Sequence, residues 1–202
     1  MVKPKNLSML MQRLADLVST SRVDPTRLTC FVCYHDADFS DVESFIRQYG
    51  TEFVPRCIGV NEKDGFVGSL DDHYIVSRVR EEILGDSTVT ILLLGMETWH
   101  QRFVDWEIAA SFHETPVRSR NGIVAMPLPS MGNRAVLPAR VRDNVLGADG
   151  EKSSVLYASY PAGRESLRTL LDRADKSRFA ETTVVDNSRP LRRTDSPLTH
   201  ES

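Results

Sequence analysis

Short apolar segments alternate with amphipathic ones along most of the chain. Five segments are rich in β-branched, aromatic or aliphatic residues, which is typical of strands: 28–34, 56–60, 87–95, 122–129 and 153–160. Four others have apolar residues three or four positions apart, which indicates helices: 40–49, 71–84, a helix that includes 103–112, and 163–175. This alternation predicts an α/β fold, with a parallel sheet flanked by helices on both faces.

The two ends of the chain differ from this central pattern. Residues 5–20 carry one apolar stripe at helical spacing, so we expect an extra N-terminal helix within an extension over 1–24. The α/β domain is expected over 25–176. From residue 177 onward Ser, Thr, Arg, Asp and Pro dominate, so we expect a mobile tail over 177–202.

Composition and charge narrow the function classes. The net charge is −3, so no basic field indicates nucleic acid as a partner. The apolar run at 91–96 is far shorter than a membrane span, and we expect no membrane partner. The chain has 3 cysteines, and this sparse, odd number is typical of reduced thiols in a cytoplasmic protein.

The cysteine pair and the histidines do not indicate a redox or metal centre. Cys30 and Cys33 have the spacing of a redox motif, but they lie within a predicted strand, where residues three apart point to opposite faces. We interpret them as two buried thiols. The 5 histidines are scattered without metal-ligand spacing, and we expect no metal.

Two acids in the stretch "FVDWEIAASF" have different local surroundings. On a helix, Asp105 has Arg102 one turn back, which suggests a solvated surface. Glu107 has only apolar or small neighbours at that spacing, so its pKa should be raised. Strand ends gather at one edge of a parallel sheet, which would place Glu107 in a cleft near the loops that follow Tyr34 and Met96. A structural acid paired with a distant arginine, or a helix face that is simply exposed, remains an equal alternative.

Other candidates are weaker when taken alone. Tyr34 and His35 end the first strand and could form a pocket wall, or simply cap the core. The loop "DGFVGS" could approach a phosphate, with Ser69 capping the next helix, or could be an ordinary loop. Trp99 and Trp106 are core or rim residues that could also stack on an adenine or nicotinamide ring.

Three motifs together resemble the TIR-like proteins of bacterial Thoeris anti-phage defence, the ThsB-type, NAD-consuming TIR domains. They are "CFVCYHDAD" on the first strand, "STVTILLLGMETW" on the third strand and "RFVDWEI" at the start of the next helix. The similarity spans about residues 28–128. Phe103 stands where the family motif usually has Trp, which keeps an aromatic wall.

The resemblance implies a flavodoxin-like sheet and an enzyme that cleaves NAD at the nicotinamide–ribose bond. NAD is then the substrate, and no cofactor is implied. The product would be a cyclic or otherwise modified ADP-ribose that signals to a separate effector. A phage-derived trigger and self-assembly are further interactions that the resemblance implies.

The resemblance also implies roles for particular residues. Glu107 corresponds to the family's catalytic glutamate, which would stabilise the positive charge that builds on the ribose as the bond breaks. The implied substrate-binding residues are Tyr34, His35, Asp36, Ser69, Trp99 and Phe103.

Two other functions remain open at this point. A non-catalytic TIR-like or receiver-like module would assemble with a partner, since the fold alone does not fix the function. A nucleotide enzyme of other chemistry, such as deoxyribosyl transfer, also uses a lone glutamate. The setting of Glu107 separates enzyme from adaptor, and analysis of products separates the two enzymes.

Overall fold

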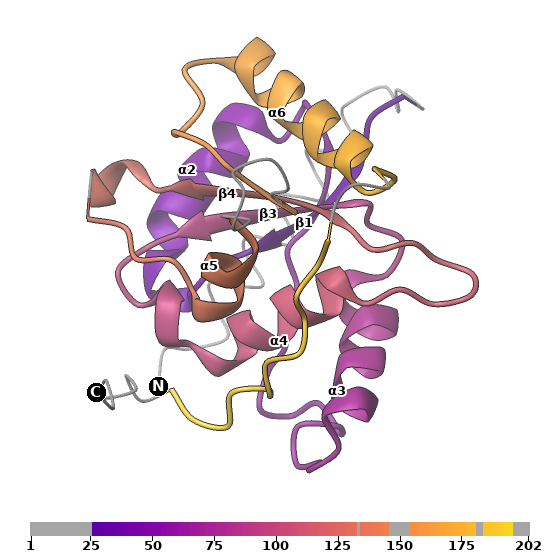
Figure 1. The fold of residues 1–202 in the computed structure, drawn as a ribbon. Helices are drawn as coiled ribbons and strands as arrows, with labels where there is room; N and C mark the ends of the chain where they lie inside the picture. The colour runs from indigo at the N-terminus through magenta and orange to yellow at the C-terminus, as the bar shows by residue number, and fades with distance from the viewer. Residues whose placement is uncertain (1–25, 133, 146–153, 181–183, 196–202) are drawn as a thin grey trace.

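A computed structural model describes residues 26–132, 134–145, 154–180 and 184–195. Within these residues the chain forms one sheet of parallel strands in the order β2-β1-β3-β4-β5 (Figure 1). The strands are β1 (Thr29–Cys33), β2 (Val54–Arg56), β3 (Val89–Leu94), β4 (Gly122–Pro127) and β5 (Val155–Tyr157). This strand order is that of flavodoxin-like folds, so the predicted fold class is confirmed.

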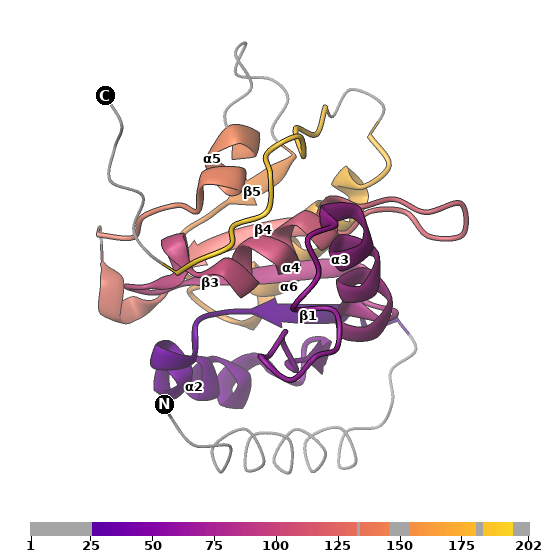
Figure 2. The same ribbon diagram turned by 90° about the horizontal axis from the view of Figure 1, so that it is seen from below.

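Helices cover both faces of the sheet, as the views in Figures 1 and 2 show. The α-helices are α2 (Phe39–Tyr49), α3 (Asp72–Arg78), α4 (Arg102–Phe112), α5 (Ala139–Val145) and α6 (Arg164–Ser177). α3 continues as a π-helix, η2 (Val79–Leu84), and short 3₁₀ turns occur at η1 (Asp36–Asp38), η3 (Thr98–His100) and η4 (Pro129–Met131). Side chains of α3, α4 and α5 share one apolar core with the sheet, and those of α2 and α6 share the other.

The strands supply both cores because successive side chains point to opposite faces. In β1, Cys30 packs with the α2 side, whereas Cys33 packs with the α4 side. Both cysteines are free and buried, which confirms the interpretation of the pair as separate buried thiols. Every residue of β3 is buried, as expected of a central strand covered on both faces.

Some elements differ from the expected pattern. The second strand ends at Arg56, where the sequence suggested that it begins. Helix α5 lies between the fourth and fifth predicted strands, in a stretch with several prolines and glycines where no helix was predicted. The predicted extension over 1–24, with its helix, lies outside the described residues, as do 181–183 and 196–202 of the predicted tail.

Residues 184–195, which we name the C-terminal strap, run along α4 and do not project from the domain (Figure 2). The indole N–H of Trp106 donates to the Arg192 carbonyl oxygen at 2.8 Å, and the Asn187 side-chain amide donates to the Ala109 carbonyl at 3.1 Å. Leu191 is only 5% exposed and joins the core on the α4 side. This part of the predicted mobile tail is therefore packed on the domain.

None of the helices in the described part of the chain combines the length and the apolar character that crossing a bilayer requires.

Candidate functional site

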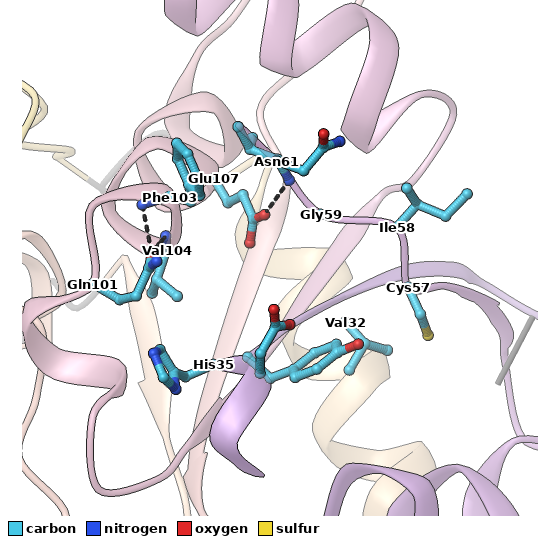
Figure 3. A pocket seen from close by; sticks show the side chains of 13 residues that line it. Val32, His35, Cys57, Ile58, Gly59, Asn61, Gln101, Phe103, Val104 and Glu107 are labelled. Carbon is cyan, nitrogen blue, oxygen red and sulfur yellow. Dashed lines mark hydrogen bonds between the residues drawn. The ribbon is translucent and has the colours of Figure 1, made fainter. Parts of the chain in front are cut away.

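A pocket of about 170 Å³ opens at the carboxyl ends of β1 and β2, beside the start of α4 (Figure 3). Ligands of open parallel sheets bind at this edge, where the strand order reverses. Three segments form its walls: the end of β1 and the loop after it, the loop after β2, and the first turns of α4. The lining residues are Val32, Tyr34, His35, Asp36, Cys57, Ile58, Gly59, Val60, Asn61, Gln101, Phe103, Val104 and Glu107.

Glu107 enters this pocket from α4 and is held by the loop after β2. Its Oε1 atom accepts the backbone N–H of Val60 at 2.9 Å, and the residue is 4% exposed. A Cβ atom at Gly59 would lie 2.5 Å from the same oxygen, so only glycine lets the loop approach the carboxylate this closely. The side chain is thus fixed at the pocket wall (Figure 3).

The electrostatic setting of Glu107 favours its neutral form. Burial raises the pKa of this carboxyl group to about 7, and the negative charge of Asp36 adds to the rise. Hydrogen bonds from the Cys33 thiol and the Val60 N–H oppose it. Burial, together with the nearby Glu107 charge, also raises the pKa of Cys33, so that thiol stays protonated and able to donate.

The structure brings five of the predicted site residues together. Tyr34, His35, Asp36 and Phe103 line the same pocket as Glu107. The backbone N–H of Ala37 donates to His35 Nδ1 at 3.1 Å, which leaves Nε2 to carry the proton of a neutral ring.

Ser69 and Trp99, the other two predicted residues, do not line this pocket. Ser69 Oγ accepts the N–H of Asp71, and it is Asp71, not Ser69, that caps α3 by accepting from Tyr74 N–H. The Trp99 ring packs edge-on against His100, with centroids 4.6 Å apart.

Other pocket residues were not singled out from the sequence. Gln101 caps α4, its side-chain oxygen accepting the N–H groups of Phe103 and Val104 at 2.6 and 3.1 Å. A polar residue just ahead of an apolar helical stretch is a readable capping signal. Gly59 and Val60 also contact Glu107. Val60 is 47 positions from Glu107 in the sequence, and no local sequence pattern predicts a contact over that distance.

The expectation of a solvated Asp105 is wrong. This residue is 3% exposed, and its carboxylate pairs with Arg140 of α5 at 3.0 Å. It also accepts the backbone N–H of Arg192 from the strap at 3.0 Å. Trp106, the residue between the two acids, bonds to the strap and does not line the pocket.

The residues that the structure describes contain no group of three or more side chains placed to hold a metal ion. The pocket itself brings several polar and aromatic side chains together. These are two carboxyl groups, a histidine, a tyrosine and an aromatic wall, all facing one small space.

Comparison with known proteins adds a family to this geometry. The family model for the TIR-like domain of the Thoeris protein ThsB matches residues 31–133, which contain most of β1, all of β2, β3 and β4, and every pocket residue. A search of curated proteins finds no match. The model covers half of the chain, and the chain therefore belongs to the family of ThsB TIR-like domains of Thoeris.

Proposed function

We propose that this domain cleaves NAD at the nicotinamide–ribose bond and makes a cyclic or modified ADP-ribose that signals to a separate effector. Membership of the Thoeris family supports a role in defence. The finer activity is supported chiefly by one observation: a buried carboxyl group, Glu107, faces a pocket and has no arginine or lysine among its hydrogen-bond partners in the described part of the chain. A purely structural acid in such a position would be expected to pair with a cation.

The proposed mechanism uses the carboxylate as an electrostatic partner for the reacting sugar. Departure of nicotinamide leaves positive charge on the ribose, spread over the anomeric carbon and the ring oxygen. A carboxylate held beside that carbon stabilises the charge, and the effect is strongest where water is excluded. Phe103 and Val104 provide such an apolar wall. Exclusion of water also favours capture of the sugar cation by another nucleophile, as a cyclic product requires.

The size of the pocket limits what it would enclose. Its volume of about 170 Å³ is below the roughly 300–1,000 Å³ typical of sites that bury a whole small molecule. The nicotinamide riboside end of the substrate would therefore enter, and the diphosphate and adenosine would lie at the mouth. Ile58 lines this pocket and is 46% exposed, which suits a rim residue.

The decisive test changes Glu107 to glutamine. Glu107→Gln keeps the size of the side chain and an oxygen acceptor for Val60 N–H, but it removes the charge. We expect nicotinamide release from NAD to fall by about a hundredfold or more, because removal of one preorganised electrostatic group costs that much in comparable sites. The measurement is nicotinamide release by purified protein, with circular dichroism to check the fold.

A second experiment, in cells, tests the same variant under conditions where a phage trigger is present. NAD and its products are measured by mass spectrometry in infected and uninfected cells that express the wild type, Glu107→Gln or Glu81→Gln. Glu81 is the control because its carboxylate is exposed on η2. NAD loss that is as large with Glu107→Gln as with the wild type would contradict the assignment.

A further inference from the structure

The pocket lacks a feature that the proposed substrate needs. NAD carries a diphosphate with two negative charges. The pocket lining has two acids, Asp36 and Glu107, and includes neither lysine nor arginine among the described residues. A cation that binds the diphosphate must therefore come from the rim, at the mouth where the outer part of the substrate would lie.

Arg102 occupies this rim. It lies between two lining residues, Gln101 and Phe103, and its guanidinium carbon is 4.5 Å from the centre of the Phe103 ring. One of its terminal nitrogens bonds to Glu62, which directly follows the lining residue Asn61. The Arg102–Glu62 pair therefore joins the start of α4 to the loop after β2, beside the pocket.

The side chain of Arg102 is partly buried and incompletely paired. Its exposed fraction is 20%, whereas that of Glu62 is 69%. The Nε atom of Arg102 is buried and has no hydrogen-bond partner within the described part of the chain. Stacking on Phe103 fixes the plane of the guanidinium, and a planar fork suits two phosphate oxygens.

We propose that Arg102 binds the diphosphate of the dinucleotide and exchanges Glu62 for it. This inference rests on the proposed function for the identity of the substrate. Glu62 is a weak partner, because water and salt screen the charge of a carboxylate that is largely exposed. A diphosphate carries more charge and offers more acceptor oxygens, so it competes well for the same guanidinium. Until substrate arrives, Glu62 pairs with one terminal nitrogen of the arginine and competes with other anions for it.

The first experiment measures binding without turnover. ADP-ribose, which has the diphosphate but no scissile nicotinamide bond, is titrated calorimetrically into the full chain. We expect Arg102→Gln to weaken binding by about tenfold to a hundredfold, the effect of losing a charged hydrogen-bond partner. Arg102→Lys should restore part of the affinity, and Glu62→Gln should leave it unchanged or strengthen it.

A matched control separates this effect from a general loss of positive charge. Arg47 on α2 also forms an ion pair with a glutamate, Glu43, but its side chain is exposed, and α2 packs on the opposite face of the sheet from α4. Arg47→Gln should bind ADP-ribose like the wild type. Equal affinity in Arg102→Gln and Arg47→Gln would overturn the assignment, and so would a wild-type protein that does not bind ADP-ribose.

The second experiment uses NAD turnover to separate failure of this inference from failure of the proposed function. In Arg102→Gln the KM for NAD should rise by about tenfold or more while kcat changes little, since the diphosphate is bound equally before and during the reaction. NAD turnover with an unchanged KM in this variant would refute the role of Arg102 and leave the function standing. If ADP-ribose binding depends on Arg102 but the protein cleaves no NAD, the role of Arg102 in binding is supported and the proposed NAD cleavage is refuted.

Discussion

At the scale of single residues, Glu107 shows how a fold can raise the pKa of a carboxyl group to near neutral pH. Burial favours the neutral form, and the pKa of about 7 leaves a large fraction ionised near neutral pH. The Cys33 thiol and the Val60 N–H keep the ionised form accessible by donating to it. An acid in this state is suited to stabilising a transient cation, because its charge is present but poorly hydrated.

This titration predicts a pH dependence of stability. The folded pKa of Glu107 lies above the unfolded value of about 4.3, so the folded protein holds this proton more tightly. Its contribution to stability is full below the unfolded pKa and is lost as pH rises towards about 7. Glu107→Gln should therefore be more stable than the wild type at pH 8, by about 1–3 kcal/mol, and should lose this advantage near pH 4. Urea unfolding at both pH values measures the difference.

The control for this measurement is Glu81→Gln, which alters an exposed carboxylate. Its stability relative to the wild type should change little between the two pH values. A Glu107→Gln variant that behaves like Glu81→Gln would show that the Glu107 carboxyl group is not desolvated in the folded protein.

At the scale of elements, α4 departs most from a surface helix, since every residue from Val104 to Phe112 is buried. The sheet covers one side, and α3, α5 and the strap cover others. Sequence periodicity located the helix and marked Glu107 as unusual. It could not reveal that Asp105 is buried, because its partner Arg140 is 35 positions away in the sequence. Arg140 also lies on α5, a short helix that was not predicted because prolines and glycines surround it.

The buried pair between α4 and α5 gives the second stability prediction. Arg140→Ala would leave the Asp105 carboxylate buried without its cation, which costs about 3–5 kcal/mol. Arg142→Ala, on the exposed side of the same helix, should cost less than about 0.5 kcal/mol. Chemical denaturation compares the two variants, and equal losses would contradict the importance of the pair.

At the scale of the whole molecule, the sequence predicted the sheet and most of its helices, but neither α5 nor the strap. Strands β1, β3 and β4 were predictable because they are apolar on both faces. The strap has the composition of a mobile tail. It is held by Leu191 in the core, by hydrogen bonds between backbone and side-chain groups, and by ion pairs such as that of Arg189 with Asp143. Such bonds depend on what the rest of the chain presents, so composition alone does not indicate them. Ser69 and Trp99 show the same limit of sequence analysis: their residue types suit a binding site, but the three-dimensional packing places both outside the pocket.

The packing of the strap predicts unequal effects of two similar truncations. Leu191→Ala should reduce the free energy of unfolding by about 2 kcal/mol, because Leu191 is buried in the core on the α4 side. Val184→Ala, at a site 68% exposed in the same segment, should change it by less than about 0.5 kcal/mol. Thermal unfolding of both variants provides the comparison, and a free tail would make the two indistinguishable.

The outer strands of the sheet have a consequence for how copies of this protein could join. β2 and β5 are each 3 residues long, so each offers only a brief row of main-chain donors and acceptors to an incoming strand. Pairing of an edge strand of one copy with an edge strand of another would therefore form few backbone hydrogen bonds. Within the described residues, a filament or ring of these domains would therefore rely on side chains of helices and loops, where single substitutions can abolish it without disturbing the protomer.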